Sequence, residues 1–169
     1  LMLPGLDLGQ LARFVVKPVM SELGMNSPAA LHLMLGTIAQ ESLGAFIDQI
    51  TGPGDVTLGP GFGLYQMERA THDDLFDNWL RYNQVPEVKV LAYRSRSPTD
   101  PVEQMAGNFW YATAVARCQY RRIPQNLPSA DDVEALAAYW KEHWNTHLGK
   151  GTIEQWVLNY GKFVKPLQL

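Results

Sequence analysis

The sequence predicts one mainly helical, all-α domain over residues 1–169, with a glycine-rich loop or small β region after its second helix. Three observations support this prediction. Hydrophobic residues make up 46% of the chain and charged residues 18%, which is typical of a globular protein with a core. Most of the chain places apolar residues at helical spacing between helix start and stop signals. Residues 48–63, in contrast, are rich in Gly and Pro and cannot continue a helix.

Capping and breaking residues define where the helices should begin and end. Ser27 and Pro28 are an N-cap and a first-turn proline, so a helix should run from there to Ser42 or Leu43, before Gly44. Another helix should begin at a sequence resembling a capping box. This box is Thr71-His72-Asp73-Asp74. The other helices are expected at residues 8–23 with a kink at Pro18, at 86–93, 101–120, 131–148 after a cap at Ser129, and 153–163 after a cap at Thr152.

Charge and hydropathy argue against several classes of function. The chain has 14 Lys and Arg against 17 Asp and Glu, a net charge of −3, which does not favour a nucleic-acid partner. The longest apolar stretch, residues 31–39, is too short to cross a membrane. His143 and His147 are one helical turn apart but have no third ligand nearby in sequence, so we expect neither a metal site nor a cofactor.

Glu41 is the first candidate for chemistry. It is expected at the C-terminal end of an otherwise apolar helix. Partial burial and the negative end of the helix dipole would both disfavour its charged form and raise its pKa. A carboxylic acid that keeps its proton near neutral pH can protonate a leaving oxygen. Its position alone favours a solvated residue at the helix end over a catalytic one, because most glutamates lie at the surface.

A pair of motifs on either side of the Gly-rich loop favours the catalytic interpretation. Glu41-Ser42 precedes the loop, and the sequence Gly-Leu-Tyr-Gln-Met-Glu follows it at residues 63–68. Within residues 35–75 this order resembles the Glu-Ser and Gly-Leu-Met-Gln motifs of soluble lytic transglycosylases and goose-type lysozymes. Gly44, Asp55 in the loop and Glu68 after the second motif fit the goose-type pattern. Residues 63–74 also look like a family of uncharacterised phage and prophage virion proteins.

This resemblance implies a lysozyme-like fold and a muramidase-type activity. The expected substrate is the β-1,4 bond between N-acetylmuramic acid and N-acetylglucosamine in the glycan strands of peptidoglycan. The resemblance also implies a protein of the phage virion that acts on the bacterial cell wall in the periplasm, with other virion proteins as further partners. Glu41 would be the acid, and Asp55 or Glu68 would be the second carboxylate that a hydrolase needs. A lytic transglycosylase would need Glu41 alone.

The second motif is expected to bind the sugar chain. Glycines at 61 and 63 would let the backbone approach the glycan, while Tyr65 and Gln66 would hydrogen-bond its hydroxyl and acetamido groups. The apolar residues between them would pack as a short strand. Ser42, the other residue of the first motif, is compatible with either enzyme mechanism.

Tyr139 is the candidate for the C-terminal Ala-Tyr-Asn motif of the same families. The sequence here is Leu-Ala-Ala-Tyr-Trp at residues 136–140, so Trp140 replaces the asparagine. Trp144-Asn145 is a second, poorer match to the motif. Packing of this aromatic helix face on the core explains Tyr139 equally well.

Two other functions fit the same sequence. One is a virion structural protein that keeps a lysozyme-like fold with little or no activity, which the net charge and Trp140 favour. The other is a glycan-binding module that has lost turnover. Whether Glu41 lines an open cleft distinguishes these functions from an enzyme.

Overall fold

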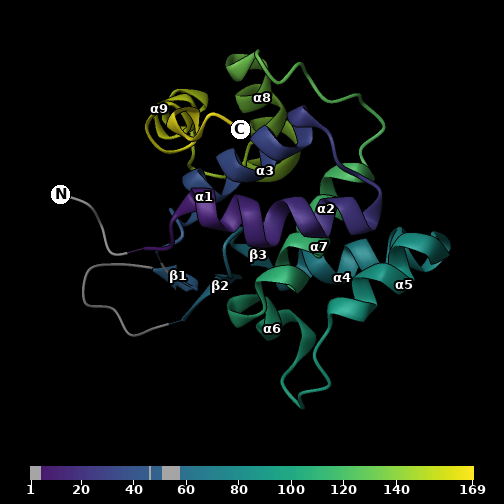
Figure 1. Ribbon diagram of the computed structural model, residues 1–169. Helices are drawn as coiled ribbons and strands as arrows, with labels where there is room; N and C mark the ends of the chain where they lie inside the picture. The colour runs from purple at the N-terminus through teal and green to yellow at the C-terminus, as the bar shows by residue number, and fades with distance from the viewer. Residues whose placement is uncertain (1–4, 46, 51–57) are drawn as a thin grey trace.

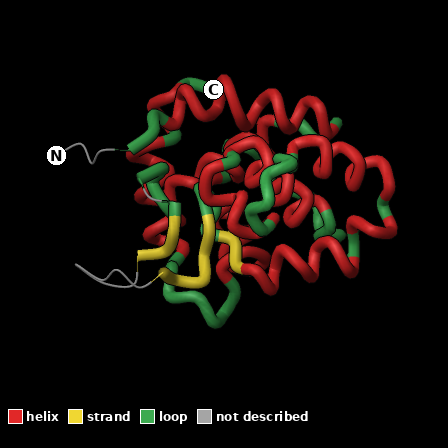
Figure 2. Tube along the Cα trace, turned by 90° about the horizontal axis from the view of Figure 1, so that it is seen from below, coloured by secondary structure: helices red, strands yellow, loops and turns green. Residues whose placement is uncertain are grey.

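The computed structural model describes residues 5–45, 47–50 and 58–169, and its architecture is mainly helical with a small sheet (Figure 1). The three strands lie together at one edge, and helices form the rest of the molecule (Figure 2). The elements are α1 (Leu8–Leu11), a π turn η1 (Ala12–Val16), α2 (Lys17–Leu23), α3 (Pro28–Glu41), β1 (Asp48–Ile50), β2 (Leu58–Phe62), β3 (Met67–Glu68), α4 (Arg69–Asn78), η2 (Leu80–Tyr82), α5 (Gln84–Tyr93), α6 (Pro101–Gly107), α7 (Phe109–Arg121), α8 (Val133–Trp140), a π turn η3 (Lys141–Asn145), α9 (Ile153–Phe163) and η4 (Lys165–Leu167).

The first expected helix forms as one continuous rod of α1, η1 and α2. It ends at Gly24, whose φ of 67° is the left-handed conformation that favours glycine. The π turn ends at Val16, two residues before Pro18, and includes Phe14, the residue four positions before the proline. A proline ring clashes with the carbonyl four residues earlier in regular α geometry, and the wider turn relieves this clash.

Helix α3 begins as predicted, with the Ser27 hydroxyl accepting a hydrogen bond from the Ala30 N–H at 3.1 Å. From Ala30 to Ala39 nearly every residue is buried. A helix that is apolar on all sides belongs in the core. Accordingly, α3 packs against α8, α9 and η1. It ends at Glu41, where Leu43 and Gly44 both turn the chain with positive φ.

The small sheet carries the second motif. Strand β2 pairs antiparallel with β1 and with β3, and Phe62 lies opposite Met67. The turn between β2 and β3 contains Gly63 at φ 76° and Gln66 at φ 51°. A Cβ at Gly63 would lie 2.0 Å from the Met105 carbonyl oxygen of α6. Glycine is therefore required here by the close packing of the turn on α6.

Several expected helix boundaries are wrong, including the end of the helix expected over residues 131–148, whose α-helical part stops at Trp140 and whose π turn stops at Asn145. Helix α4 begins at Arg69, directly after β3, and its N-cap Glu68 makes no capping hydrogen bond, so the expected capping box at Thr71 does not form. Residues 101–120 form two helices, because the Asn108 side chain accepts a hydrogen bond from the Tyr111 N–H and starts α7. Helix α8 is capped by Asp132 and not by Ser129. The α9 prediction is confirmed with its cap at Thr152, which in addition forms a capping box with Gln155.

The contact between α3 and α9 leads to a stability prediction. A Cβ at Gly36 would lie 2.1 Å from the ring of the buried Trp156, so Gly36→Ala should destabilise the fold by about 1–3 kcal/mol through overpacking. Gly161 is the matched control, because it also lies in a helix and its Cβ would meet no atom within 4 Å. Gly161→Ala should stabilise the fold by up to about 1 kcal/mol. Chemical denaturation measures both, and a Gly36→Ala protein as stable as wild type would contradict the described packing.

Candidate functional site

Glu41 lies at the C-terminal end of α3, half-buried, at the point where the core helix reaches a cleft. Burial raises the pKa of its carboxyl group from 4.5 to about 7, and a hydrogen bond from Trp140 partly opposes this rise. The negative end of the α3 dipole also disfavours a charged carboxylate at this position. Glu41 is therefore poised to hold a proton near neutral pH.

Trp140 is the polar partner of Glu41. Its indole N–H donates a hydrogen bond of 2.9 Å to the Glu41 carboxyl, and its ring is fully buried at the end of α8. One carboxyl oxygen is thus fixed by a donor whose own position is locked by packing. Such a bond favours the ionised form, so it also stabilises the carboxylate left after proton release.

A cluster of aromatic rings supports the site from behind. The Tyr120 hydroxyl hydrogen-bonds the Thr37 hydroxyl at 2.8 Å, one helical turn before Glu41. The Tyr120 ring packs against Trp144 at a centroid distance of 5.0 Å. Burial raises the pKa of Tyr120 well above its usual value, so this hydroxyl stays neutral. The cluster gives Glu41 a rigid and weakly polar surrounding.

The cleft in front of Glu41 has a volume of about 520 Å³. One side is formed by the sheet and the start of α4, and the other by η3 and the segment that follows it. Amide side chains, one exposed carboxyl group and one lysine provide the polar lining. The lining residues are Glu41, Gln49, Gln66, Met67, Glu68, Thr71, Gln119, Trp144, Asn145, Leu148, Gly149 and Lys150.

Three of the residues predicted from the sequence therefore meet in one place. Glu41, Gln66 and Glu68 all line the cleft. The Gln66 side-chain amide donates a hydrogen bond of 2.8 Å to the Gly63 carbonyl, which fixes its orientation. Glu68, in β3, is exposed to solvent. Asp55, the other candidate for a second carboxylate, lies outside the described residues.

The other predicted contacts, Ser42, Gly63, Tyr65 and Tyr139, do not line the cleft. The buried Ser42 hydroxyl donates to the Leu64 carbonyl at 2.8 Å and accepts from the Gly44 N–H. It thereby ties the end of α3 to the turn that carries Gln66. Gly63 packs on α6, as described above.

The two tyrosines are likewise committed to the scaffold. Tyr65 is 1% exposed and bonds Thr113 with its hydroxyl group. Tyr139 is buried and donates its hydroxyl to the Gln125 carbonyl. Both hydroxyl groups, which were expected to face the substrate, are thus hydrogen-bonded within the fold, where the two side chains help to shape the site.

Several residues of the site were missed by the sequence reasoning, among them Trp140 and Gln119. Trp140 was considered only as a departure from a motif. Gln119, on α7, lines the cleft with 6% of its surface exposed, and its amide oxygen has no hydrogen-bond partner. A lone amide on the apolar side of residues 109–121 was the available signal, because buried polar groups are usually paired.

Lys141 fixes the side of the cleft that follows η3. Its ammonium group donates to the Asn145 side chain at 2.6 Å and to the carbonyls of Gly149 and Gly151 at 2.9 and 2.8 Å. Thr146 in this segment has φ 61° and ψ 177°, a conformation that non-glycine residues rarely adopt. Lys141 thus holds a strained segment in the shape that forms one side of the cleft.

Within the part of the chain that the structure describes, no group of three or more His, Cys, Asp or Glu side chains is placed to hold a metal ion. His143 instead packs edge-on against Tyr139, with a centroid distance of 4.5 Å. Over the same residues no helix has the length and apolar character needed to cross a membrane.

The raised pKa of Glu41 predicts a specific pH dependence of stability. The folded state holds the Glu41 proton up to about pH 7, whereas the unfolded chain releases it near pH 4.5. The free energy of unfolding therefore loses up to about 3 kcal/mol as pH rises through this window, and is unaffected by Glu41 below it. Glu41→Gln should remove this loss, so the variant should match wild type at pH 4 and exceed it at pH 8. Equal differences between the two proteins at both pH values would refute the pKa assignment.

The role of Trp140 gives a second prediction. Trp140→Phe removes the indole donor, so the pKa of Glu41 should rise above about 7, by about one pH unit. Trp156→Phe is a matched control, because the Trp156 indole N–H is buried without a hydrogen-bond partner. That variant should leave the Glu41 pKa unchanged. Carbon NMR of the Glu41 carboxyl measures both, and equal shifts in the two variants would mean that the hydrogen bond does not act as described.

Protein-family models, curated protein sequences and solved structures yield no match to this chain. The geometry of the cleft and the motifs of residues 35–75 are therefore the features that bear on function.

Proposed function

We propose that this chain has a lysozyme-like fold and cleaves the β-1,4 bond between N-acetylmuramic acid and N-acetylglucosamine in peptidoglycan. The observation that carries the proposal is Glu41, a carboxylic acid with a pKa of about 7 that is held by a buried indole at the side of an open polar cleft. Perturbed acids in clefts are typical of catalytic sites. The proposed location is a phage or prophage virion that reaches the bacterial cell wall.

Glu41 supplies the acid step. Its proton passes to the glycosidic oxygen while the bond from that oxygen to the anomeric carbon breaks, and positive charge develops on the sugar ring. The proton leaves a carboxylate that keeps the hydrogen bond from Trp140. A strong donor to the newly charged group lowers the energy of the product of proton transfer.

The second step depends on which nucleophile reaches the anomeric carbon. In a hydrolase, Glu68 from the same cleft or Asp55 would activate water or stabilise the charged ring, and reducing ends would form. In a lytic transglycosylase, ionised Glu41 would take the proton of the sugar's own 6-hydroxyl, and an anhydro ring would close. Glu68 lines the cleft and supports the hydrolytic route.

The rest of the lining fits an N-acetylated glycan with acidic substituents. Gln49, Gln66 and Asn145 offer amide donors and acceptors for hydroxyl and acetamido groups. Trp144, half-buried beside them, offers an apolar surface for a sugar ring. Lys150 is an exposed cation at the cleft and suits the carboxylates that muramic acid and its peptides carry.

The alternative of an inactive structural protein drew support from Trp140. That residue hydrogen-bonds Glu41 in this fold, so its presence now supports an enzymatic site. The open cleft in front of Glu41 favours turnover over a covered site. We therefore place the enzymatic function first.

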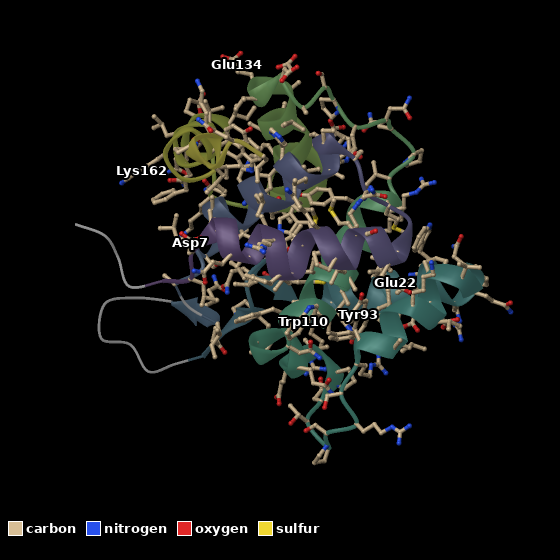
Figure 3. All side chains as sticks on the ribbon, viewed as in Figure 1. Asp7, Glu22, Tyr93, Trp110, Glu134 and Lys162 are labelled. Carbon is tan, nitrogen blue, oxygen red and sulfur yellow. The ribbon has the colours of Figure 1, made fainter. Side chains whose placement is uncertain are left out.

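The test of this proposal is Glu41→Gln on purified peptidoglycan. Glutamine preserves the size and the acceptor for Trp140 but cannot deliver a proton, so the rate of clearing should fall by about 10²–10⁴-fold with the fold intact. Glu134→Gln is the control, because Glu134 is exposed and lies at the end of α8 away from Trp140 (Figure 3). This variant should clear peptidoglycan at the wild-type rate. Mass analysis of the wild-type products separates reducing ends from anhydro ends.

A folded Glu41→Gln protein that clears peptidoglycan as fast as wild type would exclude Glu41 as the acid. An inactive wild type would shift the function to the structural alternative. Anhydro products would remove Glu68 and Asp55 from the mechanism.

A further inference from the structure

A second cavity, of about 580 Å³, lies away from the Glu41 cleft. It is formed by the end of α5, the segment 94–100 and the junction of α6 and α7. Figure 3 labels Tyr93 and Trp110, which come from α5 and α7 and lie on this side of the molecule. The cavity and the cleft share no lining residue. The cavity is lined by Ala92, Tyr93, Ser95, Ser97, Thr99, Gln104, Gly107, Asn108 and Trp110.

Two amide side chains, the buried Gln104 and the half-buried Asn108, fix the shape of this cavity. Gln104 is 7% exposed, accepts a hydrogen bond from the Ser95 N–H at 2.9 Å and donates to the Thr99 carbonyl at 3.0 Å. Asn108 donates to the Tyr93 carbonyl at 2.8 Å. The segment 94–100 is thus tied at both ends to α6 and α7. A site held in this way loses little entropy when a ligand binds.

The lining chemistry indicates the kind of ligand. Trp110 exposes 48% of its surface, and Tyr93 lies beside it in the same cavity. The Ser97 and Thr99 hydroxyls bond each other at 2.9 Å and keep further donor and acceptor capacity. None of the described residues that line the cavity carries a charge. Aromatic surface, hydroxyl groups and the absence of charge suit an uncharged ligand with an apolar face and a hydroxylated edge, as a sugar ring has.

We propose that this cavity is a second saccharide-binding site, at which Trp110 stacks on an uncharged N-acetylglucosamine ring of an N-acetylated glycan. Ser97 and Thr99 hydrogen-bond its hydroxyl groups. The identification of the ligand as an N-acetylated sugar rests on the proposed function. Peptidoglycan strands are long, so one polymer can occupy the cleft and this site.

The fold separates the two sites by α6. Met105 on this helix contacts Gly63 of the turn that carries Gln66 into the cleft, while Gln104 beside it shapes the second cavity. Binding at the Trp110 site therefore involves none of the Glu41 cleft. A tethered strand stays at high effective concentration near the cleft after each cleavage, so the site would raise retention on the cell wall and not the rate of one cleavage.

The experiment titrates a tetramer of N-acetylglucosamine into Glu41→Gln protein, which cannot turn it over. Indole N–H signals in NMR spectra report each site, and single substitutions assign those of Trp110 and Trp144. Both signals should shift. Trp110→Ala should leave the Trp144 shift unchanged and weaken pelleting with insoluble peptidoglycan by about tenfold. Tyr82→Ala is the control, because Tyr82 is a 74% exposed aromatic that lines neither cavity, and it should pellet like the parent protein.

The outcomes separate this proposal from the function of the cleft. A Trp110 signal that stays fixed while Trp144 shifts would overturn the second site and leave the cleft function intact. A Trp110 shift without a Trp144 shift would support the second site and count against the cleft. A Trp110 signal that responds to a proline-rich peptide and not to the tetramer would also overturn the proposal, because the cavity would then bind peptide.

Discussion

The burial of nearly every residue from Ala30 to Ala39 in α3 is the constraint on which the rest of this structure depends. A helix with apolar residues on every side must be covered on every side, and α8, α9 and η1 provide that cover. Gly36 allows the Trp156 ring to approach the helix backbone, which makes this cover close. The helix has one polar end, and the same packing that buries its body brings Glu41 to the cleft.

The burial of Glu41 lowers the stability of the fold and, at the same time, keeps a proton on its carboxyl group near neutral pH. Burial disfavours its charged form, and the protein offsets part of that cost with the Trp140 indole instead of with a cation. A lysine or arginine in that place would hold the carboxyl ionised and unable to donate a proton. A neutral donor leaves the pKa of Glu41 near 7. The fold is less stable as a result, but the carboxyl group keeps a proton that it can donate.

The sequence predicted the parts of this structure that depend on local signals. Ser27, Gly24 and Thr152 set helix ends through their own capping or backbone geometry. The motif pair placed Glu41, Gln66 and Glu68 at one cleft.

Features that depend on distant packing were missed. Trp140 lies 99 positions after Glu41 in the sequence, so no local sequence pattern indicates their hydrogen bond. Tyr65 and Ser42 lie in the motifs, yet hydrogen bonds to Thr113 and Leu64 commit them to the scaffold. Asn108 is a case of unrecognised local chemistry, because its cap splits one expected helix into two.

The pH dependence of kcat/KM on purified peptidoglycan tests the central claim most directly, because it reports the protonation state of the free enzyme's acid. If Glu41 is that acid, activity should fall as pH rises through about 7, the pKa that burial gives its carboxyl group. The falling limb should move to higher pH in Trp140→Phe, in which the opposing hydrogen bond is absent. A rate that is constant from pH 5 to 9, or a falling limb near 7 that Trp140→Phe leaves in place, would contradict the account.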